Sequence, residues 1–217
     1  MKIKNGIEIY HGDCLDMIPD LGVMFDAIIT DIPYNEANRP SNGLRVLDKG
    51  IADSAEIDLS VVLPLLDSVL LGSLYMFCGF QQYSFIDTFL RENKYSRRCI
   101  VWEKTNPSPM NCKHLWVSGV ELCAYGKKPK ATYNGGYENT VLRFPVERSK
   151  IHTTQKNLNL IMHLVEKSTN EGDIVLDPYL GSGTTAEACE RLNRRCVGIE
   201  KNKEYFDAAK ERLQDFK

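Results

Sequence analysis

Residues 174–185 of this sequence read Ile-Val-Leu-Asp-Pro-Tyr-Leu-Gly-Ser-Gly-Thr-Thr. The apolar run predicts a buried strand, the glycines predict a sharp turn, and residues 184–192 have the pattern of a helix. Cys196–Ile199 predicts the next strand, and an apolar stripe that ends at Phe216 predicts a final helix. A strand–helix–strand–helix unit of this kind is typical of an α/β domain with a mostly parallel sheet.

Two acids mark the ends of these two strands. Asp177 ends the first strand, and Glu200 ends the next one 23 residues later. An acid at that offset holds a ribose diol in dinucleotide-binding folds, whereas Asp177 suits an ammonium group better than a phosphate. The turn lacks both G-x-G-x-x-G and the lysine of a P-loop, so neither pattern of phosphate binding is indicated. The pair of acids favours a nucleoside that carries an amino acid, which is S-adenosylmethionine, over a purely structural turn.

The rest of the chain alternates in the same way between short apolar runs and amphipathic segments. Strands are predicted at 7–10, 25–30, 74–78, 95–102 and 120–125, a helical turn at 15–18, and helices at 59–71, 81–92 and 158–165. Pro64 should lie in the first turn of its helix or bend it. We expect one domain over residues 1–217, with a twisted, mostly parallel sheet and helices on both faces. Residues 35–54 are expected to form a mobile loop and 126–151 a second loop; loops this long commonly bind something.

A second set of chemically informative residues follows the strand predicted at 25–30. Asp31-Ile32-Pro33-Tyr34 places an acid, an extended backbone and an aromatic ring where open α/β sheets bind ligands. Pro33 holds Ile32 extended, so the Ile32 carbonyl and the Asp31 carboxylate form two neighbouring acceptors. Two acceptors can take both hydrogens of an amino group and direct its lone pair at a methyl donor. Tyr34 can stack on a base that has been flipped out of a duplex.

These motifs together resemble the β-group DNA amino-methyltransferases, in which the catalytic motif precedes the cofactor motif. That family's Asp-Pro-Pro-Tyr is matched by Asp31 to Tyr34, and its cofactor motif by Asp177 to Thr185 with Glu200. Gly12-Asp13-Cys14 and His152-Thr153-Thr154-Gln155-Lys156 match two further motifs, and Trp102-Glu103-Lys104 and Gly119-Val120-Glu121 resemble the middle strands. The resemblance implies a Rossmann-like methyltransferase fold with permuted motif order and covers nearly the whole chain.

The resemblance also implies a role for each matched residue. The catalytic residues would be Asp31, Ile32, Pro33 and Tyr34. Residues on the cofactor side would be Asp13, Cys14, Asp31, Thr154, Gln155, Lys156, Asp177, Tyr179, Gly181, Ser182, Gly183, Thr184, Thr185 and Glu200. In the family the acid at Asp13 contacts the adenine of the cofactor. Transfer would be direct, without a covalent enzyme intermediate.

Two departures from the family pattern bear on specificity and activity. Ile32 replaces the first proline but still supplies a carbonyl, so we expect activity with reduced rigidity. Thr153 and Asn157 replace the prolines that flank Thr-Gln-Lys, a change that we interpret as minor. Asp31 rather than serine favours adenine N6 as the target. Cytosine N4, methylation of RNA or of a protein amide, and a DNA-binding regulator without catalysis stay as alternatives.

The charge distribution supports a polyanion as the partner. The net charge of −2 argues against general coating of nucleic acid, but 13 Lys/Arg and only 5 Asp/Glu lie between Arg91 and Lys156. A short target-recognition segment is expected at 127–150, with phosphate contacts from Lys127, Lys128, Lys130, Arg143 and Arg148. Double-stranded DNA is the expected substrate, and a homodimer and a cognate restriction nuclease are further partners to consider.

The remaining composition indicates an ordinary globular domain. The chain has 217 residues, 43% hydrophobic and 26% charged. Seven cysteines without C-x-x-C spacing indicate neither a disulfide framework nor a metal site. No apolar run approaches the roughly 20 residues of a membrane span, and no signal peptide is evident, so we expect a cytoplasmic protein.

Overall fold

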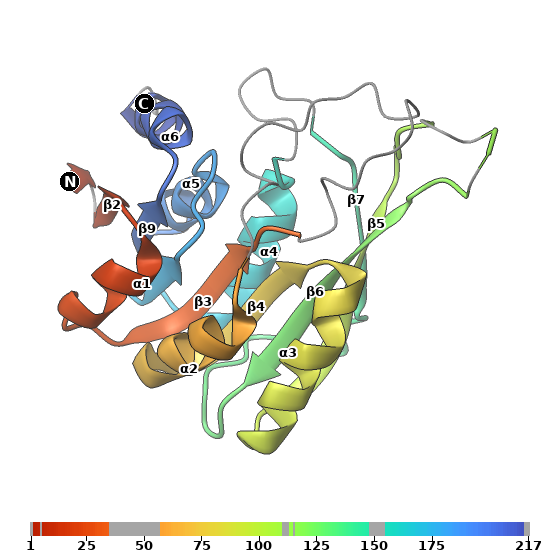
Figure 1. The fold of residues 1–217 in the computed structure, drawn as a ribbon, viewed down its shortest axis with the longest axis horizontal. Helices are drawn as coiled ribbons and strands as arrows, with labels where there is room; N and C mark the ends of the chain where they lie inside the picture. Colours follow the sequence, from red (N-terminus) through yellow and green to blue (C-terminus); the bar gives the residue numbers. More distant parts are fainter. Residues whose placement is uncertain are drawn as a thin grey trace.

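The computed structural model describes residues 2–4, 6–34, 57–109, 113–114, 116–147 and 155–214. Within them, nine strands form one sheet in the order β1-β2-β9-β8-β3-β4-β6-β5-β7 (Figure 1). The strands are β1 (Lys2–Lys4), β2 (Ile7–His11), β3 (Phe25–Asp31), β4 (Leu70–Cys78), β5 (Ser96–Lys104), β6 (Val120–Lys127), β7 (Val141–Phe144), β8 (Ile174–Asp177) and β9 (Arg195–Glu200). The helices are α1 (Cys14–Met17), a 3₁₀ turn η1 (Ile18–Asp20), α2 (Leu59–Val69), α3 (Phe80–Glu92), α4 (Leu158–Ser168), α5 (Thr184–Arg191) and α6 (Lys203–Gln214).

The sheet is mostly parallel, as the sequence predicts. β2, β9, β8, β3 and β4 run in the same direction, while β1 and β6 are antiparallel to their neighbours. β7 is parallel to β5 at the far edge. Parallel neighbours bring their carboxyl ends to one edge of the sheet, and this is the edge where open α/β sheets bind ligands.

Helices cover both faces of the sheet, and each face has its own core. On one face Phe25, Ile28 and Leu74 pack against α1, α2 and α3. On the other face Ile29 and Phe77 belong to the core that includes α4, α5 and α6. Figure 1 shows α2 and α3 in front of the sheet and α4 behind it. Strands buried on both faces explain why these runs are apolar without alternation.

The boundary between α2 and β4 differs from the prediction. The helix was expected to extend to Leu71, but it ends at Val69 and the strand begins at Leu70. Pro64 lies inside the helix rather than in its first turn. Leu70 pairs with Phe25 on β3, so the residues after Val69 belong to the sheet although their side chains continue the helical pattern. Gly72 permits the close approach of the two strands, because a Cβ there would lie 1.9 Å from the Asp26 carbonyl oxygen.

The segment expected to be a loop at 126–151 is not a single loop. β6 continues to Lys127, and Val141–Phe144 forms β7, which pairs with β5. Leu142 and Phe144 point toward the core while Val141 and Arg143 point outward, but an alternation this short between polar residues is a weak signal. The loop expected at 35–54 lies outside the described residues. None of the described helices is long and apolar enough to cross a membrane.

Candidate active site

Four adjacent strands each end near an acid, and the four acids line one cavity of about 470 Å³. Asp13 follows β2, Glu200 ends β9, Asp177 ends β8 and Asp31 ends β3. Since these strands are neighbours in the sheet, the two motifs that are farthest apart in the sequence open onto the same space. An acidic cavity of this kind favours a ligand that carries positive charge.

The turn between β8 and α5 contains two glycines, Gly181 and Gly183, in left-handed backbone conformations. Gly183 has φ of +82°, and its amide donates to the Leu180 carbonyl at 3.0 Å. A Cβ at Gly183 would also lie 3.3 Å from the Cβ of Ala209 on α6. The Gly181 amide donates to the Glu200 carboxylate at 2.8 Å, so the turn is tied to the end of β9. A side chain at position 183 would be strained by the positive φ and crowded by Ala209, which is why glycine suits this position.

The four acids differ in how their charge is balanced. Lys201 pairs with Asp13 at 2.8 Å, and Lys156 pairs with Asp31 at 2.6 Å. Within the described residues, Asp177 and Glu200 take part in no ion pair. The carboxylate of Asp177 instead accepts hydrogen bonds from the Thr30 hydroxyl (2.8 Å) and the Tyr179 amide (3.2 Å).

Burial raises the pKa of Asp177 to about 7, against the lowering effect of its hydrogen-bond donors, among them the Thr185 and Thr30 hydroxyls. Burial also raises the pKa of Glu200, although the amides of Asn202 and Gly181 oppose the shift. Asp177 is buried and Glu200 is half-buried, and neither has a cationic partner within the described residues, so both are poorly solvated when ionised and a cationic ligand would relieve this cost. These two carboxylates therefore fit a ligand such as S-adenosylmethionine, which carries an ammonium and a sulfonium group. No group of His, Cys, Asp and Glu able to hold a metal ion occurs in the described part of the chain.

Asp31 belongs to a row of alternating charges. Lys156 lies between Asp31 and Glu121, at 2.6 and 2.9 Å, and Glu121 also pairs with Lys104 at 2.7 Å. Burial acts to raise the pKa of Glu121, but the ammonium groups of Lys156 and Lys104 lower it to about 2. Burial acts to lower the pKa of Lys156, yet the carboxylates of Asp31 and Glu121 raise it above its usual value. Lys156 thus stays protonated beside Asp31, and its ammonium group faces the acid of the catalytic motif.

The turn at 31–34 is held by backbone contacts. The Ile32 amide donates to the Phe77 carbonyl at 3.2 Å, a bond that a proline in this position could not make. The reduced rigidity expected from Ile32 stays a prediction. The Pro33 carbonyl accepts from the Gln82 side chain at 2.9 Å, while the Ile32 carbonyl accepts no hydrogen bond within the described residues. The Tyr34 hydroxyl donates to Asp31 at 3.0 Å.

Gln82 connects this turn to the beginning of α3. Its amide nitrogen donates to Pro33, and its amide oxygen accepts from the Gly79 amide at 2.8 Å. Only 7% of the residue is exposed. We expect Gln82→Leu to lower the free energy of unfolding by about 2–4 kcal/mol, because it leaves two backbone groups without partners. Denaturant unfolding measures the change, and Gln81→Leu, on the exposed side of the same helix, is the control. Equal losses in the two variants would contradict a role for the Gln82 hydrogen bonds.

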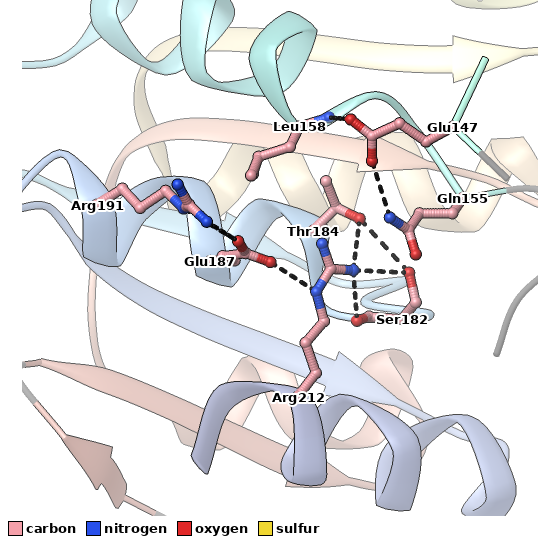
Figure 2. A network of polar contacts seen from close by, with 8 residues as sticks. All are labelled: Glu147, Gln155, Leu158, Ser182, Thr184, Glu187, Arg191 and Arg212. Carbon is pink, nitrogen blue, oxygen red and sulfur yellow. Dashed lines mark hydrogen bonds and ion pairs between the residues drawn. The ribbon is translucent and has the colours of Figure 1, made fainter. Parts of the chain in front are cut away.

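The segment that enters α4 carries part of the predicted cofactor motif. Gln155 lines the cavity, and its side chain donates to Glu147 at 3.1 Å (Figure 2). The other oxygen of Glu147 accepts from the Leu158 amide at 3.0 Å, at the first turn of α4. Asn157, where the family has proline, caps α4 by accepting from the Leu160 amide at 3.0 Å. The replacement is therefore compatible with the helix start. Thr154 and Arg148 lie outside the described residues.

The predicted cofactor residues that are described lie around this cavity, with Gly183 within its turn. Cys14 is buried in the wall, where burial raises the pKa of its thiol. Tyr34 is not among the residues that line the cavity; its hydroxyl turns toward Asp31, and the Lys156 ammonium lies 5.5 Å from its ring centroid. Stacking of Tyr34 on a base stays a prediction.

The predicted DNA-binding residues do not gather at this edge. Lys127 pairs in register with Ser73 near the beginning of β4, whereas the catalytic turn lies at the other end of β3 and β4. The Lys128 ammonium pairs with Asp67 at 2.9 Å, and Lys130 follows in the turn after β6. Arg143, on β7, pairs with Glu103 at 3.0 Å. Contact of these residues with phosphates stays a prediction. The fold places the three lysines away from the cavity.

Some residues that shape the site had no role assigned to them from the sequence. Thr30 links the two motifs through its bond to Asp177, and Gln82, Lys104 and Glu121 support the catalytic turn and Asp31. Glu121 had a usable signal, because a glutamate beside the apolar run of β6 is unusual for a buried strand. Gln82 had none, since one glutamine in an amphipathic helix is an ordinary surface residue.

Three comparisons relate the chain to known proteins. Residues 113–211 match the family model described as "DNA methylase" for N6 and N4 methyltransferases. The solved M1.HpyAVI–SAM complex is 34% identical, with a TM-score of 0.75, over 95% of this chain and 99% of that one. The type II methyltransferase M2.DpnII of Streptococcus pneumoniae is 34% identical over 137 residues, which are 53% of this chain and 50% of that protein.

A third relative is matched over most of its length. The type II methyltransferase M2.MboI of Moraxella bovis is 26% identical over 95% of this chain and 87% of that protein. In the M2.DpnII comparison, by contrast, this chain spans about half the length of the curated relative. The M1.HpyAVI match covers both chains nearly completely, so the expected fold class is confirmed.

Proposed function

This chain belongs to the DNA amino-methyltransferase family, and from that premise we propose that it methylates adenine N6 in double-stranded DNA with S-adenosylmethionine as methyl donor. One observation carries the proposal. The turn at Asp31–Tyr34 and the turn at Asp177–Thr185 come from opposite ends of the sequence, yet both contribute to the wall of one cavity. A methyl donor and a methyl acceptor have to meet in one space for direct transfer.

The cofactor half of the site is formed by the ends of β2, β8 and β9. We assign Asp177 to the ammonium group, because it is buried and has no cationic partner within the described residues. Glu200 binds the ribose hydroxyls. It lies at the end of β9, the strand next to β8, and an acid at this place binds the ribose in Rossmann-like folds. Asp13 contacts the adenine, as in the family. Bound in this way, S-adenosylmethionine supplies an activated methyl group.

The acceptor half is the turn after β3. The Asp31 carboxylate and the Ile32 carbonyl accept the two hydrogens of the target amino group and leave its lone pair directed at the methyl donor. The Pro33 carbonyl already accepts a hydrogen bond from Gln82, whereas the Ile32 carbonyl accepts none within the described residues, so the Ile32 carbonyl is the proposed backbone acceptor. Lys156 holds Asp31 in place at 2.6 Å, and Tyr34 stacks on the flipped base.

Adenine is the proposed base because the catalytic motif begins with Asp31 rather than serine. The protein would recognise a short DNA sequence, and type II relatives such as M2.DpnII suggest a restriction–modification system as its setting. Five basic side chains, Lys127, Lys128, Lys130, Arg143 and Arg148, are the proposed phosphate contacts, with a second subunit as one way to bring the distant lysines to the same DNA.

The decisive experiment expresses this chain in a host that lacks DNA methylation and maps modified bases on the recovered DNA. We expect N6-methyladenine at one short recurring sequence, and none with an Asp31→Ala variant expressed at the same level. Detection of N4-methylcytosine in its place would change the proposed target from adenine N6 to cytosine N4. An unmodified genome, together with purified protein that methylates neither DNA nor RNA, would contradict the proposed function and favour a DNA-binding protein without catalysis.

A further inference from the structure

The last helix, α6, reaches the cofactor turn through a single arginine. Arg212 lies near the carboxyl end of α6 and crosses to the turn between β8 and α5 (Figure 2). One guanidinium nitrogen, Nη1, donates to the Ser182 carbonyl at 3.1 Å, to the Ser182 hydroxyl at 3.3 Å and to the Thr184 hydroxyl at 3.1 Å. These atoms flank Gly183, whose left-handed conformation shapes the turn.

The orientation of the guanidinium group is itself fixed. Its Nε donates to Glu187 at 2.6 Å, and Glu187 is only 5% exposed. The other oxygen of Glu187 accepts two bonds from Arg191, at 3.0 and 2.7 Å. Figure 2 shows Glu187 between the two arginines, with Arg212 alone reaching Ser182 and Thr184. The planar fork of arginine suits this task, because one edge binds the carboxylate while the other binds the turn.

Packing supports the same contact. A Cβ on Gly183 would lie 3.3 Å from the Cβ of Ala209 and 3.7 Å from a methyl group of Leu213, both on α6. The helix therefore lies directly against the outer side of the turn. Ser182 and Thr184 line the cavity on the inner side, whereas Arg212 is not among its lining residues.

From this arrangement we propose that Arg212 is a positioning residue that holds the cofactor turn in its binding conformation. This inference rests on the proposed function, since the ligand of the turn is taken to be S-adenosylmethionine. Arg212 fixes the peptide between Ser182 and Gly183 and the hydroxyl groups on either side. Without this support the turn has more conformations to lose when the cofactor binds, so cofactor affinity falls while the acceptor half of the site is unaffected.

The test compares Arg212→Met with Arg191→Met. Both variants remove one arginine from Glu187, but only Arg212→Met removes the bonds to the turn. We expect Arg212→Met to weaken binding of S-adenosylmethionine by about tenfold or more in calorimetric titrations. The KM for the cofactor should rise accordingly, with kcat at saturating cofactor and the Kd for DNA changed by less than about threefold. Arg191→Met should bind the cofactor within about twofold of the unmodified protein.

Arg212→Lys provides a second variant that keeps the charge and the helix packing. One ammonium group cannot bind Glu187 and the turn together. The cofactor affinity of Arg212→Lys should therefore lie between those of the unmodified protein and Arg212→Met. Unchanged cofactor binding in both Arg212 variants would overturn the inference, as would an equal loss in Arg191→Met, because the effect would then pass through Glu187 alone. An unmodified protein that binds no S-adenosylmethionine would overturn the proposed function and this inference with it.

Discussion

Replacing Asp31 by asparagine is expected to lower kcat for methyl transfer by about a thousandfold or more, with the protein still folded. The amino group of the base donates a hydrogen to Asp31, and positive charge develops on its nitrogen as the new bond forms. Asparagine can keep one oxygen toward Lys156, which lies 2.6 Å from the carboxylate. Its NH₂ then faces the incoming amino group, so a donor meets a donor and the negative charge is lost.

Cofactor affinity of Asp31→Asn should change by less than about tenfold, because Lys156 already balances the charge of Asp31. Single-turnover kinetics with prebound cofactor measure the chemical step, and calorimetry measures the affinity. Asp20→Asn, at an exposed acid in η1, is the control for the change of net charge. A large loss of affinity with little loss of kcat would assign Asp31 to cofactor binding instead of acceptor orientation.

The acids of the site were foreseeable from the sequence because each ends a predicted strand. Asp177 and Glu200 follow apolar runs of a clear strand–helix–strand unit, and Asp31 follows another such run. Parallel strands bring their carboxyl ends together, so three strand-end acids in one sheet have few other places to lie. The structure brings them together with Asp13 around one cavity.

The supporting residues were not foreseeable because their contacts join distant parts of the chain. Gln82 reaches Pro33 across 49 positions, and Arg212 reaches Ser182 across 30. No local periodicity indicates such a partner. Charge alone was equally uninformative about position: Lys127 and Lys128 stand in a basic segment, but the antiparallel direction of β6 carries them to the end of the sheet opposite the cavity.

Replacing Asp177 by asparagine is expected to stabilise the protein without cofactor and to weaken cofactor binding at the same time. The carboxyl oxygen Oδ1 accepts hydrogen bonds from the Thr30 hydroxyl and from the Tyr179 amide, and the asparagine oxygen can accept these two in its place. Loss of the negative charge removes the partner of the ammonium group. A charge-assisted hydrogen bond contributes about 1.5–3 kcal/mol, so affinity should fall by roughly ten- to a hundredfold.

The pH dependence gives the sign of the stability change. Burial raises the pKa of Asp177 to about 7 from a value near 4 in the unfolded chain, so the folded state holds a proton that the unfolded state has released. Stability from this group is therefore lost as pH rises from about 4 to 7. Asparagine does not titrate, and the advantage of the variant should grow by roughly 2–3 kcal/mol between pH 5 and 8. Asp20→Asn should show no such trend.

Thermal unfolding with and without S-adenosylmethionine tests both effects in one experiment. At 100 times its Kd a ligand stabilises the folded state by about 2.7 kcal/mol, so saturating cofactor should raise the Tm of the unmodified protein. Asp177→Asn should have the higher Tm at pH 8 without cofactor and gain much less from its addition. If the variant were instead less stable at every pH, the Asp177 carboxylate would be stabilised by its surroundings, and its ionisation would not need a cationic ligand. If it kept full cofactor affinity, the ammonium group would have to bind elsewhere in the cavity.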